Sequence, residues 1–133
     1  MKVTTDACIQ GAWMPVLPHV RQVLDIGTGT GLLALMLAQR SGDIHIDAIE
    51  MDVNAARQAG ENVAASPWSN RVHIMAGDAR SYNFRVKYDL IISNPPFEYF
   101  WPSPIIASVS QYTKDGSFLL STATTLFTGA PLW

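Results

Sequence analysis

The sequence predicts an α/β fold of three layers, built on a mostly parallel sheet. Short apolar runs alternate with helical patterns between residues 21 and 93, which is the signature of strand-helix-strand units. Three glycines at alternate positions separate the first apolar run from the first helical pattern, as in ligand-binding turns of such folds. With 133 residues, of which 48% are apolar, the chain has the size and composition of one domain with a single core.

Four strands and two helices are expected in this region. The predicted strands are residues 23–26, 44–49, 71–76 and 88–93, and the predicted helices are residues 31–40 and a segment that starts after Asp52 and ends before Ser66-Pro67. The second strand alternates apolar with polar residues, so one of its faces is expected to be less buried. The run Leu90-Ile91-Ile92 is continuously apolar, which is typical of a strand covered on both faces.

The two ends of the chain carry weaker patterns than the predicted core at residues 21–97. Residues 1–20 predict a helix or turn that leads into the sheet, with Thr5 or Asp6 as its cap. In residues 98–133 the pattern fails, because prolines at 102 and 104 interrupt the apolar run and Ser and Thr are frequent. This tail is therefore of uncertain structure, apart from a candidate fifth strand at residues 116–120 with no helix leading into it.

Charge and composition exclude several classes of protein. The net charge is -2 and no segment gathers five or six basic residues, so electrostatics gives no support to nucleic-acid binding. The single cysteine, Cys8, is expected to pack rather than react, and the three histidines lack metal-ligand spacing, so no metal is predicted. Neither a leader nor an apolar run of about 18 residues is found, which predicts a cytoplasmic protein that does not enter a membrane.

The turn Gly27-Thr28-Gly29-Thr30-Gly31 is the first candidate site. Glycine has no Cβ, so the backbone can turn sharply there and a ligand can approach it closely. The dinucleotide fingerprint requires a further small residue one position later, where this sequence has Leu32, so a nicotinamide cofactor is disfavoured. Glycines also end strands for purely structural reasons, but the strand before this turn and the helix after it favour ligand binding.

Two carboxylates follow later strands at the same predicted edge of the sheet. Glu50 comes about twenty residues after the glycines, where a carboxylate can accept hydrogen bonds from both hydroxyls of a ribose. Asp78 lies in Gly77-Asp78-Ala79, after the third strand. Either residue could instead be an ordinary acid of a solvated turn. The convergence of strand ends at one edge, where ligands of open α/β sheets bind, favours the binding interpretation.

The tetrapeptide Asn94-Pro95-Pro96-Phe97 directly follows the fourth strand and carries the predicted chemistry. The Asn94 side-chain oxygen and the Pro95 carbonyl can each accept one hydrogen of a planar amino group, which favours the pyramidal nitrogen that attacks a methyl donor. Pro95 and Pro96 stiffen the loop, and Phe97 can stack on a base. The same residues are also good turn formers, so the tetrapeptide could simply end the strand. Its position after the glycine turn and Asp78 favours the functional interpretation.

The form Asp-x-Gly-x-Gly-x-Gly from Asp25 to Gly31, taken with the other motifs, resembles the class I S-adenosylmethionine-dependent methyltransferases. The resemblance implies a Rossmann-like three-layer sandwich in which the glycine turn and Asp25 lie beside the methionine part of the cofactor. It also implies that Asp78 accepts the amino hydrogens of the cofactor's adenine and that the Ala79 N–H meets a ring nitrogen. The Asn-Pro-Pro-aromatic motif is similar to that of the amino methyltransferases, which act on adenine in DNA or RNA, guanine in ribosomal RNA, or glutamine in release factors.

A closer resemblance is to the bacterial tRNA(Val) adenine-N6 methyltransferase family. It is carried by residues 2–6, 11–13, 24–27, 31–40, 66–68 and 89–96. It implies methyl transfer to the 6-amino group of adenine, with tRNA as the partner. Thr4 stands where the family has glycine, and family members are nearly twice as long. Residues 98–133 do not match the family's continuation, so the chain is expected to be truncated, or altered in reading frame, after about Phe97.

Other outcomes stay open from the sequence. The acceptor could be ribosomal RNA guanine or release-factor glutamine, or the chain could be a non-catalytic cofactor-binding fragment. A nucleotide-dependent oxidoreductase would require Leu32 to be tolerated at the glycine position. A chain that departs from the family after the fourth strand would expose the edge of that strand unless the tail pairs with it, which predicts self-association or poor solubility.

Overall fold

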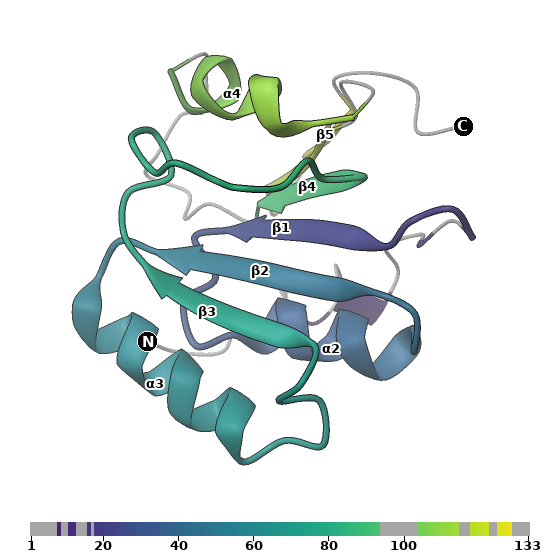
Figure 1. Ribbon diagram of the computed structural model, residues 1–133, viewed down its shortest axis with the longest axis vertical. Helices are drawn as coiled ribbons and strands as arrows, with labels where there is room; N and C mark the ends of the chain where they lie inside the picture. The colour runs from purple at the N-terminus through teal and green to yellow at the C-terminus, as the bar shows by residue number, and fades with distance from the viewer. Residues whose placement is uncertain are drawn as a thin grey trace.

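The computed structural model describes residues 8, 11–12, 16, 18–93, 104–114, 118–122 and 125–128. Its elements in chain order are β1 (Gln22–Ile26), α2 (Leu32–Arg40), β2 (His45–Glu50), α3 (Val53–Ala64), β3 (Val72–Ala76), β4 (Leu90–Ser93), α4 (Pro104–Val109), the short 3-10 helix η1 (Ser110–Tyr112), β5 (Phe118–Thr122) and β6 (Thr125–Thr128). The strands form one sheet in the order β3-β2-β1-β4-β5-β6, in which neighbours are parallel except β5 and β6 (Figure 1). The elements predicted between residues 21 and 93 are confirmed, with ends that differ by no more than two residues.

The sheet is covered on both faces, which gives the three layers that the sequence predicts (Figure 1). On one face, α2 and α3 pack through residues such as Leu37 and Val63. On the other face, the connection between β3 and β4 and the helix α4 pack through Phe84, Tyr88 and Val109. β4 lies between these layers and is buried along its whole length, as its continuous apolar run predicts.

The register brings the carboxyl ends of four parallel strands to one edge of the sheet. Ile26 at the end of β1 lies opposite Ile49 of β2 and Ser93 of β4, and Glu50 lies opposite Ala76 of β3. The segments that follow β1, β2 and β3 therefore leave the sheet at the same edge, which is also where β4 ends. This edge is where the sequence places all of its candidate site residues.

Hydrogen bonds from side chains fix the helices and connections to this sheet. The Asp52 carboxylate caps α3 by accepting the Ala55 N–H at 2.9 Å, as predicted. The Arg71 guanidinium donates to three carbonyls at the end of α2 and in the following loop, at 2.7 to 3.0 Å. On the less buried face of β2, Asp47 accepts the Tyr88 hydroxyl at 2.5 Å, and burial together with this acceptor raises the pKa of Tyr88 far above its ordinary value. This last bond ties the connection between β3 and β4 to the sheet.

The tail contains a helix that the sequence did not predict. α4 begins at Pro104, which by itself indicates a break in structure. A proline at the first position of a helix costs no hydrogen bond, because the first N–H groups of a helix have no partner within it. The expectation that no helix precedes the fifth strand is therefore wrong. The fifth strand itself is present as β5 at Phe118–Thr122, and positions 116 and 117 of the predicted strand lie outside the described residues.

The tail also pairs with β4. β5 lies parallel to β4 from Ile91↔Phe118 to Ser93↔Leu120, and β6 continues the sheet antiparallel to β5. β4 is thus an interior strand, so the exposed β4 edge considered from the sequence is not formed. Self-association through an edge of the described sheet would use β3 or β6, and it stays a prediction.

Only part of the predicted N-terminal helix is described. Cys8, Gly11 and Ala12 have helical backbone, and the Gly11 carbonyl accepts a hydrogen bond from Arg40 at 2.8 Å. This bond joins the N-terminal segment to the end of α2. The predicted cap residues, at positions 5 and 6, lie outside the described residues.

Candidate functional site

The glycine turn has a backbone conformation that glycine adopts most easily. Gly27, Gly29 and Gly31 have φ values of 72°, 59° and 85°, in the left-handed region where a Cβ is costly. The N–H groups of Gly27 and Thr28 donate to the Ile49 carbonyl at 2.8 and 3.2 Å, which fastens the turn to β2. Apart from its chain neighbours, no described residue has an atom within 4 Å of where a Cβ of Gly27 would lie. The backbone is therefore open to a ligand at this point.

Glu50 joins the glycine turn to the turn that follows β3. Its carboxylate accepts the Gly29 N–H at 3.0 Å and the Asp52 N–H at 3.3 Å, and its main-chain carbonyl accepts the Gly77 N–H at 2.9 Å. The residue is only 9% exposed. Each carboxylate oxygen has two lone pairs and accepts one of these bonds, so both oxygens can still accept a ligand hydroxyl.

Asp25 is buried below the same turn. The residue is 1% exposed, and its carboxylate accepts a hydrogen bond from the Thr28 hydroxyl at 2.8 Å. Burial raises the pKa of Asp25 to about 7; the Thr28 hydrogen bond opposes this rise, and the negative charge of Glu50 adds to it. A buried carboxyl beside a second carboxylate is fully ionised at neutral pH only if a positive charge compensates it.

No basic side chain supplies that charge among the residues that the structure describes. The ion pairs in this part of the chain are Arg57–Glu61, His73–Asp47, Arg80–Asp78 and Lys114–Asp89. Within the described part of the chain, Asp25 and Glu50 are therefore two buried carboxyl groups without a cationic partner, beside an open glycine turn. The arrangement fits a small ligand that carries a positive charge near Asp25 and hydroxyl groups near Glu50.

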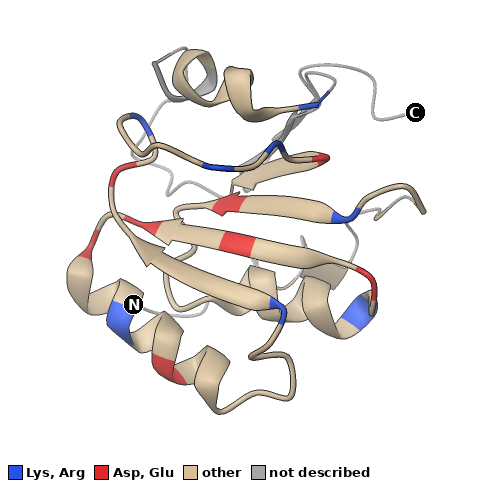
Figure 2. Ribbon diagram, viewed as in Figure 1, with Lys and Arg blue, Asp and Glu red and all other residues tan. Residues whose placement is uncertain are grey.

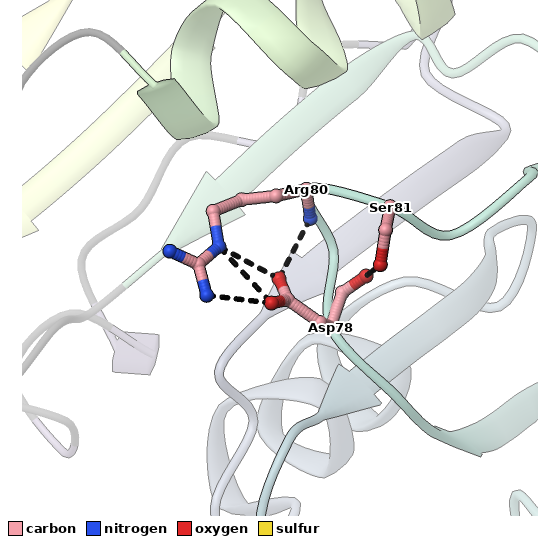
Figure 3. Close-up of polar contacts among 3 residues, drawn as sticks. All are labelled: Asp78, Arg80 and Ser81. Atoms are coloured by element: carbon pink, nitrogen blue, oxygen red, sulfur yellow. Dashed lines mark hydrogen bonds and ion pairs between the residues drawn. The ribbon is translucent and has the colours of Figure 1, made fainter.

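Asp78 and Ala79 lie in the next turn along the same edge, after β3. Ala79 is buried, whereas the Asp78 side chain is 31% exposed. Hydrogen bonds from the Arg80 side chain and N–H hold the pKa of Asp78 below its ordinary value. Figure 3 shows the Arg80 guanidinium lying against the Asp78 carboxylate. The Gly77 N–H bond to Glu50 connects this turn to the glycine turn.

The end of β4 is fixed to the end of β1. The Ser93 hydroxyl donates to the Ile26 carbonyl at 2.9 Å, and both groups are buried. The predicted catalytic residues follow Ser93 directly in the sequence. Asn94, Pro95, Pro96 and Phe97 themselves lie outside the described residues, so their roles stay predictions.

Three residues of the site were not identified from the sequence. Thr28 is the donor to Asp25, Arg80 is the partner of Asp78, and the Asn62 amide of α3 donates to the Thr30 carbonyl of the glycine turn at 2.9 Å. Thr28 could have been found, because a hydroxyl three residues after a buried acid within one tight turn is a plausible donor. The contacts of Arg80 and Asn62 depend on turn shape and helix packing, which spacing alone does not define.

The described surface has mixed charge. Figure 2 shows acidic and basic residues interspersed along the ribbon, and the connection between β3 and β4 carries Arg80, Arg85 and Lys87. Within the described ranges, no group of three or more His, Cys, Asp or Glu side chains is arranged to hold a metal ion. The described helices are also too short or too polar to cross a membrane.

The chain matches known proteins over most of its length. Residues 12–102 match the family model described as "Methyltransferase small domain". A tRNA1(Val) (adenine(37)-N6)-methyltransferase from Aeromonas salmonicida (strain A449) is 60% identical over 98 residues, which cover 73% of this chain and 41% of that protein. A protein of the same name from Erwinia tasmaniensis is 53% identical over 116 residues, which cover 85% of this chain and 46% of that protein. The chain therefore spans less than half the length of these curated relatives.

Solved structures share the fold. A putative S-adenosyl-L-methionine-dependent methyltransferase from Methanococcus maripaludis is 26% identical with a TM-score of 0.65, over 77% of this chain and 48% of that chain. The glycopeptide N-methyltransferase MtfA, complexed with S-adenosyl-L-methionine, is 18% identical with a TM-score of 0.70, over 87% of this chain and 52% of that chain. The Rossmann-like methyltransferase fold predicted from the sequence is confirmed.

Asp25→Asn should change the dependence of stability on pH. Folding raises the pKa of Asp25 from 3.8 to about 7, so between these values the folded chain keeps a proton that the unfolded chain has released. Asp25 therefore lowers the free energy of unfolding as pH rises through this window, and its effect is constant above it. Asparagine does not titrate and still accepts the Thr28 hydroxyl, so the variant should gain stability relative to the unchanged chain as pH rises.

Urea unfolding between about pH 4 and about pH 8 measures this gain as the difference between variant and unchanged chain. Asp43→Asn, in the exposed loop before β2, is the matched control for removal of a carboxylate and should change the free energy of unfolding by less than about 0.5 kcal/mol. A difference for Asp25→Asn that does not vary with pH would contradict the buried, proton-binding carboxyl.

Proposed function

Because the chain belongs to the methyltransferase small domain family, we propose that it is the cofactor-binding part of an S-adenosylmethionine-dependent methyltransferase that methylates the 6-amino group of adenine in tRNA. One observation carries the proposal: Asp25 and Glu50 are buried, lack a basic partner among the described residues and flank a turn of positive-φ glycines. A cofactor that combines a sulfonium, an ammonium group and a ribose matches this site. Its positive charge would compensate Asp25, and its hydroxyls would donate to Glu50.

The same carboxylates argue against a dinucleotide. A pyrophosphate at the glycine turn would bring two negative charges close to Asp25 and Glu50, where no described basic side chain offsets them. The Leu32 position disfavours the dinucleotide independently, because the third small residue of that fingerprint is missing. Charge and sequence therefore support the same cofactor class.

Each predicted cofactor residue has a role that its surroundings support. Glu50 would accept the ribose hydroxyls with the lone pairs that its main-chain donors leave unused. Asp78 would accept from the amino group of the cofactor's adenine, and the Ala79 N–H would meet a ring nitrogen. The first N–H groups of α2 have no side-chain cap in the described structure, so they can receive the carboxylate of the methionine part.

The predicted catalytic residues orient the acceptor. When bound, S-adenosylmethionine supplies a methyl group on a positively charged sulfur, from which it leaves readily. Asn94 and Pro95 would each accept one hydrogen of the adenine amino group, which frees the nitrogen lone pair for in-line attack. Pro96 would stiffen the loop and Phe97 would stack on the base. The amine proton can leave after the attack, so this scheme needs no general base.

The choice of tRNA rests on the relatives. Proteins that are 60% and 53% identical to this chain are named tRNA1(Val) (adenine(37)-N6)-methyltransferases, and the family match at residues 12–102 includes Asn94 to Phe97. We therefore propose tRNA as partner and the cytoplasm as location. The net charge of -2 adds no electrostatic support, so the acceptor follows from the site and the relatives and not from surface charge.

A second candidate is a cofactor-binding protein that does not transfer the methyl group. The match covers 41% and 46% of the two relatives, and the site residues that the structure describes are those proposed for the cofactor. Both candidates predict cofactor binding at Asp25 and Glu50. They differ only in whether the acceptor is modified.

Glu50→Gln should weaken the binding of S-adenosylhomocysteine by about 10- to 100-fold, because a charged acceptor of hydroxyl groups is replaced by a neutral one. Titration calorimetry at high micromolar protein measures the Kd, and circular dichroism checks that the variant is folded. Glu61→Gln is the matched control on α3, where the side chain is 69% exposed, and its Kd should stay within about twofold. Absence of heat with the unchanged chain would rule out cofactor binding.

The unchanged chain should transfer tritium from labelled cofactor into N6-methyladenine of tRNA. Asn94→Ala should reduce this transfer by about 100- to 1000-fold without changing the Kd for S-adenosylhomocysteine, because it removes an acceptor that acts on the attacking amine. Label in ribosomal RNA guanine or in a release-factor glutamine would move the proposal to a related amino methyltransferase. Cofactor binding without any transfer would support the second candidate.

A further inference from the structure

The turn after β3 is held in a defined shape by its own hydrogen bonds. The Asp78 carbonyl accepts the N–H groups of Ser81 and Tyr82 at 3.1 and 2.9 Å, and the Tyr82 ring packs against Phe84 with 4.8 Å between centroids. A Cβ at Gly77 would lie 3.1 Å from the Tyr82 ring, so the ring closes tightly over the start of the turn. The backbone of Asp78 is therefore fixed relative to the carboxyl edge of the sheet.

Arg80 fixes the side chain of Asp78 on this backbone (Figure 3). Asp78 Oδ1 accepts the Arg80 main-chain N–H at 2.9 Å and Nε at 3.0 Å. Asp78 Oδ2 accepts Nη2 at 2.6 Å and lies 3.1 Å from Nε. The guanidinium is planar, so its two nitrogens orient both carboxylate oxygens at once.

These contacts leave Asp78 one acceptor position. Nε has a single hydrogen, which lies between the two oxygens, so Arg80 offers three hydrogens in total to this carboxylate. A carboxylate has four lone pairs, so one of them receives no hydrogen from Arg80. That position can accept one N–H of an exocyclic amino group, and it would repel a carbonyl oxygen.

The ion pair between Arg80 and Asp78 is not explained by a contribution to the stability of the fold. The Arg80 and Asp78 side chains are 52% and 31% exposed, and ion pairs that are exposed to this degree contribute little to the free energy of unfolding. Arg80 lies two residues after Asp78, so the pair also brings no distant elements together. Its evident effect is on the direction and ionisation of the Asp78 carboxylate.

We propose that Arg80 is a positioning residue of the cofactor site, which aims the one free acceptor of Asp78 so that the site selects a 6-aminopurine over a 6-oxopurine. The inference rests on the proposed function, because it takes the purine to be that of S-adenosylmethionine. Arg80 acts through Asp78 and does not touch the reacting atoms. A site built to accept a ligand N–H discriminates strongly against an analogue that lacks it.

Calorimetry with S-adenosylhomocysteine and with S-inosylhomocysteine, in which a carbonyl replaces the amino group, tests the inference on the full chain. The unchanged chain should prefer S-adenosylhomocysteine by at least about 20-fold. Arg80→Ala should reduce this preference to about threefold, chiefly by weakening the binding of S-adenosylhomocysteine, because the Asp78 carboxylate is no longer held in one orientation. Arg80→Lys keeps the charge without the planar fork and should lose most of the preference as well.

Arg85→Ala, an exposed residue of the same connection, is the control and should keep the full preference. Equal weakening of both ligands by Arg80→Ala, an unchanged preference in Arg80→Lys, or tighter binding of S-adenosylhomocysteine by either variant would each overturn the inference. An unchanged chain that binds S-adenosylhomocysteine without preference would overturn it too, although cofactor binding would stand. If the unchanged chain binds neither ligand, the proposed function fails together with the inference.

Discussion

Glu50 accepts hydrogen bonds with both its side chain and its main chain, and the carboxyl edge of the sheet is organised around these bonds. The carboxylate holds the Gly29 N–H and the carbonyl holds the Gly77 N–H, so the turns after β1 and β3 are both positioned by the last residue of β2. This is possible because the three strands are parallel neighbours that end together. A ligand bound at Glu50 would therefore contact both turns without a change in the backbone.

The burial of the Asp25 and Glu50 carboxyl groups at this edge has an electrostatic cost. Burial is the main cause of the raised pKa of Asp25, and the nearby charge of Glu50 adds to it. A proton on Asp25 relieves this cost in the free chain, and a positively charged ligand would relieve it in the complex. Perturbed carboxyl groups of this kind are common at functional sites, because binding and catalysis need charges that stability alone would not retain. Release of that proton would then accompany cofactor binding near neutral pH.

The fold between residues 21 and 93 could be predicted because local sequence signals and burial agree there: Asp52 caps α3, and the apolar run of β4 is buried. Pro104 could not be interpreted in this way, since a proline indicates a break unless the start of a helix is already known. In the site, the spacing of the glycines predicted a sharp turn that a ligand can approach, and the structure gives these three glycines positive φ values. The reach of Arg80 to Asp78 depends on the shape of one turn, which no spacing or periodicity records. The sequence therefore locates the acidic groups of the site but not the groups that orient them.

Amide NMR of the 15N-labelled chain during a titration with S-adenosylhomocysteine tests most directly whether the carboxyl edge is the cofactor site. The largest shifts should occur at Gly27, Gly29, Gly31 and Ala79, because the ligand would lie against the glycine turn and the turn after β3. Absence of shifts at millimolar ligand would contradict the cofactor site that we propose. Shifts gathered at the opposite edge of the sheet, around Gln22, would contradict it equally.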